Sequence, residues 1–225
     1  MVIGHRGNPD RFPDNSLAGI ISGLEIAGAV EVDVRLSGDG HLVLSHDPSV
    51  SGVVIAESTW MELSEIDLGG GHRLCLLDEV LALGGHIDLE VKNLPGQPGF
   101  HEDGRLALMV ASRARPEDVV TSFYWPDMDI VRRLAPDVET GLLVGDLGSV
   151  DDALRYCRSG GHGVIAVAAS LMDEEVCDRA DRQGVAVVCW TVNERPLAFE
   201  LARQGASAII SDRPQYILGG FRGEG

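Results

Sequence analysis

Eight short apolar runs recur along the chain, each three to seven residues long and rich in valine, isoleucine and alanine. Runs of this length, bounded by glycine, proline and polar residues, are typical of β-strands. The expected strands cover residues 2–4, 30–36, 86–91, 119–122, 140–143, 164–167, 186–190 and 208–210. One more strand is expected at residues 41–45, soon after the second of these.

Longer segments with the apolar spacing of amphipathic helices separate most of these strands. The expected helices cover residues 16–27, 77–83, 105–114, 126–134, 150–158, 174–183 and 195–204. Because each helix carries the chain back to the starting edge of the sheet, consecutive strands are expected to pair in parallel. Eight such units predict a closed (β/α)8 TIM barrel, with a doubly wound open sheet as the alternative.

Residues 48–71 interrupt the alternation after the second strand. They are irregular and glycine-bearing, with room for one short helix at residues 61–66. We therefore expect a short cap insertion over the strand ends. No linker-like stretch divides the chain, and residues 1–225 are expected to form one domain.

The chain carries a formal net charge of -17. A field of that sign repels polyanions, which disfavours nucleic acid or an anionic membrane as a partner and leaves a small molecule as the expected one. No long apolar run and no leader-like start are visible, so we expect a cytoplasmic protein without stable membrane insertion. The four cysteines form no C-x-x-C pair and are expected as buried thiols. The sequence indicates no particular oligomeric state.

Acidic residues occupy one face of the second expected strand. Glu31 and Asp33 alternate with valines, and because the apolar face must meet the helices, both carboxylates are expected to point toward the barrel axis. Two like charges there need a cation. Arg35 on the same face could supply it in a salt-bridge network, which is the alternative to a metal ion.

The third expected strand repeats this arrangement, because Asp88, Glu90 and Lys92 share one face. A third carboxylate beside the first two favours a divalent cation with oxygen ligands, Mg²⁺ or Ca²⁺. Lys92 is expected nearer the mouth, where it could neutralise a phosphate oxygen; the alternative is a lysine that closes a surface ion pair.

Two histidines follow expected strand ends, at the edge where TIM barrels carry their catalytic residues. His5 and Arg6 come directly after the first strand between Gly4 and Gly7, and His46 follows residues 41–45. A histidine can move a proton near neutral pH, and an arginine fork matches a phosphate. Each segment alone would also be compatible with an ordinary capping histidine.

Together these motifs resemble the glycerophosphodiester phosphodiesterase family, in order and in spacing, from Met1 to about Pro214. The matching segments are His5-Arg6-Gly7, Pro13-Asp14-Asn15-Ser16, Glu31-Val32-Asp33-Val34, Asp39-Gly40, His46-Asp47, Leu89-Glu90-Val91-Lys92, Ser122-Phe123, Trp190-Thr191-Val192-Asn193 and Ser211-Asp212-Arg213-Pro214. The family usually has Pro-Glu-Asn-Thr at the second of these segments.

The resemblance implies a set of roles for these residues and the release of glycerol 3-phosphate and an alcohol. Glu31, Asp33 and Glu90 would bind one divalent cation, His5 and His46 would be the acid and the base, and Arg6 and Lys92 would hold the phosphate. Trp190 would line the substrate groove or lie in the core. Asn15 would reach the metal and phosphate or only cap the first helix, and the cap is slightly favoured.

Substrate choice is less well defined than the chemistry. The segment after His46-Asp47 lacks the Arg-Thr-Thr run common in the family, and the insertion is short. One alternative is a phospholipase-type barrel that cleaves lysophospholipids or phosphoinositides, with Val50, Val53, Val54, Ile55 and Trp60 as lipid contacts. Another is a catalytically silent barrel that binds a ligand.

Overall fold

A closed barrel of parallel strands forms the centre of the molecule. The computed structural model describes residues 1–173 and 175–221, and within these residues eight parallel strands follow one another around the barrel. They are β1 (Val2–Gly4), β2 (Ala29–Leu36), β8 (His86–Val91), β9 (Val119–Ser122), β10 (Glu139–Val144), β11 (Val164–Ala168), β12 (Ala186–Trp190) and β13 (Ala208–Ser211). Closure is complete because β1 pairs with both β13 and β2. The predicted TIM barrel is confirmed.

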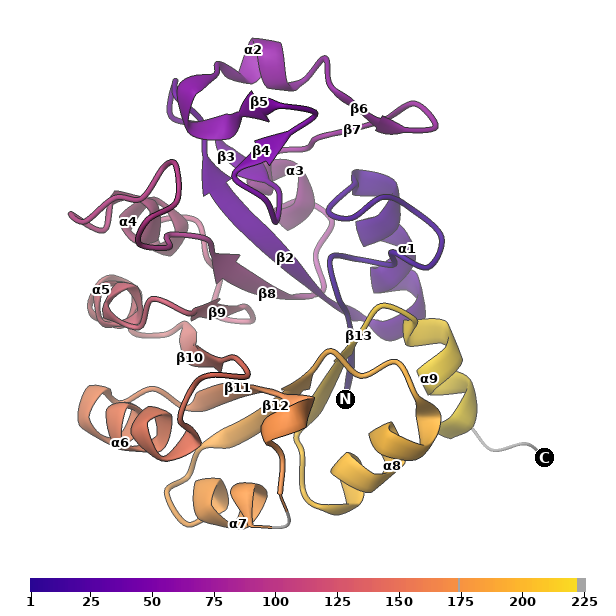
Figure 1. The fold of residues 1–225 in the computed structure, drawn as a ribbon, viewed down its shortest axis with the longest axis vertical. Coiled ribbons are helices and arrows are strands. Elements are labelled where there is room, and N and C mark those ends of the chain that lie inside the picture. Colours follow the sequence, from indigo (N-terminus) through magenta and orange to yellow (C-terminus); the bar gives the residue numbers. More distant parts are fainter. Residues whose placement is uncertain (174, 222–225) are drawn as a thin grey trace.

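Helices form an outer ring around these strands (Figure 1). They are α1 (Leu17–Ala27), α3 (Leu77–Leu81), α4 (Arg105–Ala111), α5 (Pro126–Leu134), α6 (Val150–Gly160), α7 (Val176–Asp181), α8 (Arg195–Arg203) and α9 (Pro214–Phe221). The first seven agree with the predicted helices, although residue 174, the predicted start of one, lies outside the described residues. We did not predict α9, because its sequence contains two glycines and little polar and apolar alternation.

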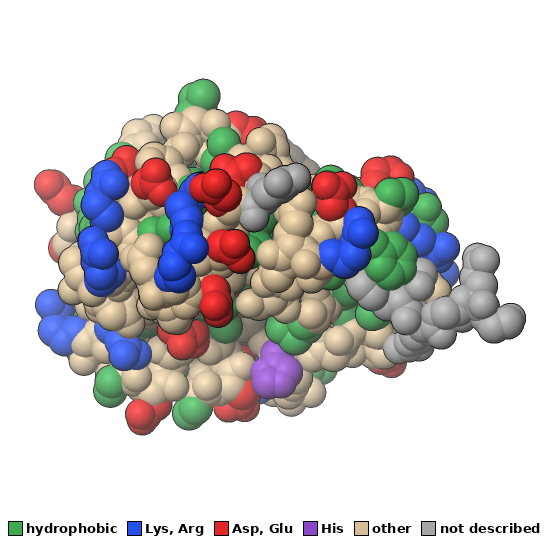
Figure 2. All heavy atoms as spheres, turned by 90° about the horizontal axis from the view of Figure 1, so that it is seen from below, with side chains coloured by type: hydrophobic (Ala, Val, Ile, Leu, Met, Phe, Trp, Pro, Cys, Tyr) green, Lys and Arg blue, Asp and Glu red, His purple; other side chains and the backbone are tan. Residues whose placement is uncertain are grey.

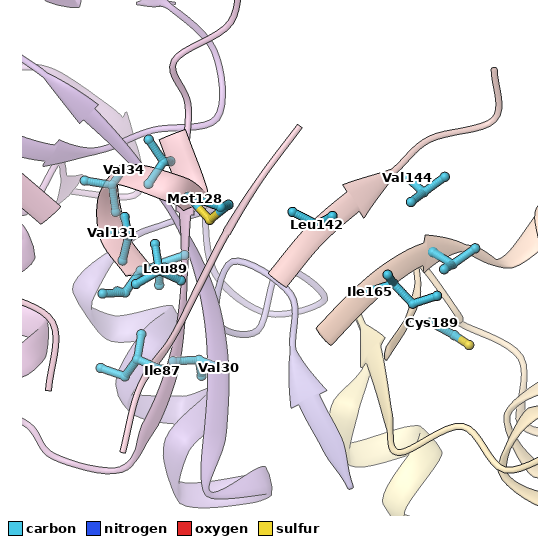
Figure 3. Packing of buried hydrophobic residues seen from close by; sticks show 14 of the residues in the cluster. Val30, Val34, Ile87, Leu89, Met128, Val131, Leu142, Val144, Ile165 and Cys189 are labelled. Atoms are coloured by element: carbon cyan, nitrogen blue, oxygen red, sulfur yellow. The ribbon is translucent and has the colours of Figure 1, made fainter. Parts of the chain in front are cut away.

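The main hydrophobic core lies between the strands and the helices. Val34 of β2 and Leu89 of β8 point outward and lie near Met128 and Val131 of α5, and all four are fully buried (Figure 3). Val30 of β2 lies beside Ile87 of β8 in the same core. These are the apolar positions of the alternating strand pattern. Because alternate side chains face opposite sides of a strand, the intervening positions must point into the barrel.

The inside of the barrel holds a smaller apolar cluster beneath a polar layer. Small and medium side chains fill its lower part, among them Ile3, Ala29, Ala166 and Ile210. Toward the carboxyl ends of β2 and β8 the inward positions become acidic. This layer lies at the end of the barrel that carries the strand-to-helix loops.

The segment after β2 forms a cap at one end of the molecule (Figure 1). β3 (Leu42–Leu44) pairs antiparallel with β2 and leads into two small hairpins and a short helix. These elements are β4 (Ser49–Val50), β5 (Val53–Val54), the 3-10 helix Ile55–Glu57, α2 (Trp60–Leu63), β6 (Asp67–Gly69) and β7 (His72–Arg73). The cap has its own apolar cluster, which includes Ile55 and Leu63. The two hairpins were not predicted, because each strand has only two or three residues.

The four cysteines are buried free thiols, as predicted. Figure 2, which views the molecule from the side of α7, shows basic and acidic side chains interspersed. Within α6 Arg155 pairs with Asp152, and Arg179 of α7 pairs with Asp151 of α6. Among the described residues, no helix has both the length and the apolar character needed to cross a bilayer.

Candidate active site

Three carboxylates from two neighbouring strands meet inside the mouth of the barrel. Glu31 and Asp33 lie on β2, and Glu90 lies on β8 directly opposite Asp33. One oxygen from each lies within 4.8 Å of the others, and all three residues are buried. The alternation of polar and apolar residues therefore positioned these side chains as expected.

Neighbouring loops hold two of these carboxylates in place. The backbone N–H of Arg6 donates to Glu31 Oε2 over 2.9 Å. Asn15 donates from Nδ2 to Asp33 Oδ2 over 2.8 Å and accepts from the Asp33 backbone N–H over 3.1 Å. The favoured capping role of Asn15 is wrong, because Ser16 is the residue that caps α1 with its side chain. Asn15 instead orients a carboxylate of the acidic cluster.

Two basic side chains neutralise part of this acidic cluster. Lys92 Nζ lies 2.7 Å from Glu90 Oε1 and 3.3 Å from Asp33 Oδ1. Arg6 Nε lies 3.3 Å from Asp33 Oδ2. Lys92 is buried, so the alternative of a surface ion pair is wrong.

Arg35 does not form the salt-bridge network that was the alternative to a metal ion. Its guanidinium donates to the backbone carbonyls of His46 and Lys92 and to Gln97 Oε1. It therefore fixes the loops that carry two site residues. Its charge is not in contact with the carboxylates in the described structure.

The pKa values of these carboxylates are shifted because the side chains are buried close together. Burial and the nearby charges of Asp33 and Glu90 raise the pKa of Glu31 well above its usual range. Burial also raises the pKa of Glu90 and of Asp88 to about 7. For Asp33, burial acts in the same direction, but the charges of Lys92 and Arg6 and the hydrogen bond from Asn15 together outweigh it, and the pKa is lowered. The cluster therefore contains more carboxylates than Lys92 and Arg6 can neutralise.

These residues fit a divalent cation. Glu31 Oε1 is buried and accepts no hydrogen bond from the described residues, and Asp33 Oδ1 has only the Lys92 ammonium 3.3 Å away. A buried polar atom without a partner is costly, and a carboxylate oxygen in this position is a suitable ligand for a hard cation. Three converging carboxylates also repel one another until a positive charge joins them.

The two histidines each hydrogen-bond a carboxylate through Nδ1. His5 Nδ1 lies 2.6 Å from Asp212 Oδ1, and His46 Nδ1 lies 2.8 Å from Asp47 Oδ1. This leaves Nε2 of each ring to face the pocket, and His5 Nε2 lies 3.9 Å from Glu31 Oε2. Burial, followed by the positive charge of Lys92, lowers the pKa of His46.

The glycines that flank His5 and Arg6 are needed by the backbone itself. Gly7 has φ +94, and a Cβ there would lie 2.6 Å from the backbone carbon of Gly19 in α1. A Cβ on Gly4 would lie 2.1 Å from the Gly7 carbonyl oxygen. A tight turn packed on α1 therefore aims these two side chains into the mouth of the barrel.

A pocket of about 240 Å³ contains these groups. Its lining includes both histidines and both basic residues, with Glu31 and Glu90. Phe123 and Trp190 form an aromatic wall, with ring centroids 5.7 Å apart and planes at 87°. Trp190 is half-buried and donates to the Ala166 carbonyl, so it lines the pocket and also belongs to the barrel.

Comparison with known proteins agrees with this geometry. Residues 5–216 match the Glycerophosphoryl diester phosphodiesterase family. The chain belongs to this family. The resemblance found from the sequence motifs is therefore confirmed over nearly the whole chain.

Individual members of the glycerophosphoryl diester phosphodiesterase family align along most of their length. A "Glycerophosphodiester phosphodiesterase" of Caldanaerobacter subterraneus subsp. tengcongensis is 26% identical over 97% of this chain and 96% of its own. A Mycobacterium tuberculosis protein described as "Probable glycerophosphodiester phosphodiesterase 1" is 32% identical over 86% of this chain and 82% of its own.

Solved structures also superpose on this chain over nearly its whole length. A phosphodiesterase of Oleispira antarctica, in complex with the product sn-glycerol-3-phosphate, superposes with a TM-score of 0.86 and 25% identity, covering 99% of this chain and 97% of its own. A Silicibacter pomeroyi structure described as a "Putative glycerophosphoryl diester phosphodiesterase" has a TM-score of 0.84 and 25% identity, covering 98% of this chain and 93% of its own.

The sequence predicted nine residues of the site but assigned no role to three of their neighbours. Asp212 orients His5, Phe123 forms part of the wall, and Asp88 accepts a hydrogen bond from Thr121 below Glu90. The Ser122-Phe123 and Ser211-Asp212 motifs were a signal for the first two. The alternation that placed Glu90 inward also places Asp88 inward.

Proposed function

We propose that the chain hydrolyses glycerophosphodiesters to sn-glycerol 3-phosphate and an alcohol, and that it needs a divalent cation to do so. The observation that carries this proposal is the convergence of an acidic cluster, two histidines and two basic side chains in one pocket. The product bound to the Oleispira antarctica phosphodiesterase supports the same substrate class.

Glu31, Asp33 and Glu90 would hold the cation, either Mg²⁺ or Ca²⁺, because all three ligands are hard oxygens. When bound, the ion would act as a Lewis acid that draws negative charge from the phosphate. Asn15 and the Arg6 backbone support this arrangement, because they fix the oxygens of Asp33 and Glu31.

Arg6 and Lys92 would bind the non-bridging phosphate oxygens. Lys92 donates a hydrogen bond to Glu90 and pairs with Asp33 at 3.3 Å, and because an ammonium has three donors, at least one remains for the substrate. The side chain of Arg6 is about a fifth exposed and lines the pocket. Both cations would stabilise charge that grows on phosphorus-bound oxygen as the bond to the alcohol breaks.

His5 and His46 would carry the protons through Nε2. Hydrolysis breaks the bond between phosphorus and the alcohol oxygen and forms a bond to an attacking oxygen. One histidine takes the proton of that attacking oxygen, and the other gives a proton to the departing alcohol. The Nδ1 contacts with Asp212 and Asp47 keep each ring in the required orientation.

The proposal is tested with His5→Ala and His46→Ala, with and without a chelator. Release of glycerol 3-phosphate should fall about 10²-fold or more in each variant, since each loses a proton carrier. His86→Ala is the matched control, because His86 is exposed at the start of β8 and should leave turnover unchanged. Turnover that survives both chelation and the loss of either histidine would contradict the proposal.

The phospholipase alternative has less support. The cap residues that could have contacted lipid pack on its own core: Ile55 is 1% exposed, and Val50, Val53 and Trp60 pack on that cluster. The silent-barrel alternative is also disfavoured, since both histidines, both basic residues and two of the carboxylates line one pocket. The cytoplasmic location and the single-domain organisation stay predictions.

A further inference from the structure

The two histidines of the site are held in different ways. The ring of His5 is hydrogen-bonded to Asp212, and Asn193 donates to the other oxygen of that carboxylate. The ring of His46 is hydrogen-bonded to Asp47, whose side chain is 74% exposed and has no other hydrogen bond or ion pair in the described residues. An exposed side-chain contact of this kind stabilises little. The orientation of His46 therefore depends on how its backbone is held.

The backbone of His46 is held by the guanidinium of Arg35. Arg35 lies on β2 and donates to the His46 carbonyl from Nε over 3.0 Å and from Nη2 over 2.5 Å. His46 follows β3 in an irregular segment, and no other donor to its carbonyl is found in the part of the chain that the structure describes. Two donors of one planar fork fix both the distance and the direction of the carbonyl that they share.

The same guanidinium reaches the loop that follows β8. Nη2 of Arg35 also donates to Gln97 Oε1 over 3.0 Å, and Nη1 donates to the Lys92 carbonyl over a longer 3.4 Å. Arg35 therefore joins the segment that carries His46 to the strand end that carries Lys92. A proton carrier and a phosphate-binding cation are thereby tied to one buried side chain.

Arg35 supports these residues from outside the barrel pocket. It is only 4% exposed, and the lining of the barrel pocket does not include it. It lines instead a cavity of about 10 Å³ beside Lys92, together with Pro48 and Pro98. A cavity of that size holds a single water molecule at most. A substrate in the barrel pocket therefore does not touch the guanidinium.

Given the hydrolysis proposed above, we propose that Arg35 is a positioning residue for His46. It acts through the His46 main chain, and Asp212 acts on His5 through the ring. Proton transfer requires the imidazole to lie within hydrogen-bonding distance of the reacting oxygen. A displacement of about 1 Å in such a group can lower a rate about 10²-fold, so the fork of Arg35 is needed for turnover although it binds no substrate.

The first test is Arg35→Met, which keeps much of the side-chain volume and removes every donor. Its kcat should fall about 10- to 100-fold, while KM changes by less than about threefold because Arg35 lies outside the pocket. The stoichiometry of divalent-cation binding, measured by titration calorimetry, counts the folded sites and should be unchanged. If this variant does not fold, the same comparisons are made with Arg35→Lys.

Arg35→Lys keeps the positive charge and loses the planar fork. Its kcat should fall about tenfold, because one ammonium cannot replace donors that act together on His46, Lys92 and Gln97. Full activity in Arg35→Lys would show that the charge alone matters, and this result would overturn the inference.

A double-mutant cycle distinguishes positioning of His46 from a general structural effect. If Arg35 acts through His46, its substitution costs little once the imidazole is gone. The double variant Arg35→Met/His46→Ala should therefore turn over within about threefold of His46→Ala. Two independent roles would multiply the two losses, and a multiplied loss would contradict the positioning role.

Arg73→Met is the matched control. Arg73 of the cap also donates to a backbone carbonyl, that of Glu65, but it lies far from any residue of the site in its contacts and outside the barrel pocket. Its kcat and KM should stay at the wild-type values. A fully active Arg35→Met would refute this inference and leave the hydrolysis intact, whereas a wild type that releases no glycerol 3-phosphate would refute the proposed function itself.

Discussion

His5 Nδ1 and Asp212 Oδ1 lie 2.6 Å apart, although the two residues are separated by 207 positions in the sequence. Asn193 holds the other Asp212 oxygen over 2.7 Å and accepts from the Asp212 backbone N–H. Burial acts to raise the pKa of Asp212, but the hydrogen bonds from His5 and Asn193, together with the charges of His5 and Arg6, outweigh it and lower this pKa. Asp212 is therefore an ionised positioning residue for the His5 ring.

We expect Asp212→Asn to lower kcat about 10²-fold while KM changes by less than a few-fold. The amide has no negative charge to hold Nδ1–H, so Nε2 is no longer aimed and the charged form of the ring is less favoured. The pH profile of kcat should shift as well, which a purely structural loss would not cause. Asp151→Asn on the exposed face of α6 is the control, and an equal loss there would count against this role.

Asn15 and Ser16 are adjacent but should respond differently to substitution. Asn15→Ala removes both hydrogen bonds to Asp33 and should weaken divalent-cation binding 10- to 100-fold, measured by titration calorimetry. Ser16→Ala removes the cap of α1 and should lower the free energy of unfolding by about 1 kcal/mol. Cation binding should stay unchanged in Ser16→Ala. If Asn15→Ala only destabilised the fold, the assignment of Asn15 would be wrong.

Addition of a divalent cation should raise the melting temperature of the protein. At an ion concentration of about 100 times the Kd, binding adds about 2.7 kcal/mol to stability, which is a shift of roughly 5–10 °C for a chain of this size. Glu31→Gln removes one carboxylate of the acidic cluster and should abolish most of the shift. Glu25→Gln, at an exposed position of α1, should retain it. A shift that persists in Glu31→Gln would place the ion elsewhere.

Asp39 attaches the cap to the barrel in a pH-dependent way. Hydrogen bonds from Ser37, His41 and the Trp60 backbone N–H lower its pKa from 3.8 to about 2. Because this pKa is depressed, the stabilisation is present above pH 3.8 and is lost as the pH falls toward 2. Asp39→Asn should thus melt earlier than the wild type at pH 7, with a difference that shrinks below pH 4. A constant difference at every pH would contradict this.

The strand pattern predicted much of the site because it decides which side of a strand each residue occupies. Glu31 and Asp33 had to face the barrel axis once their valine neighbours faced the helices, and Glu90 followed by the same rule. The element that escaped prediction, α9, carries a weak periodic signal. It forms because Pro214 starts it and because Ile217 is fully buried against the barrel.

The pattern within one segment could not predict a side-chain contact whose partner comes from a distant part of the chain. A capping role for Asn15 was plausible from sequence because asparagine caps helices well, but the folded loop turns its amide toward Asp33. Arg35 was a plausible partner for the acids because it shares their face, but the carbonyls of the next loops are closer to its guanidinium.

The sequence by itself determined the order of the eight barrel strands and of the seven helices between them, the inward direction of the acidic side chains and the family. These follow from periodicity and from motifs that each occupy a few consecutive residues. Only the tertiary structure decided that Asp212 meets His5, that Lys92 contacts two carboxylates and that Arg35 holds the carbonyl of His46. Closure of the barrel brings the ends of distant strands together, and alternation along one strand contains no information about which residue of another strand lies opposite.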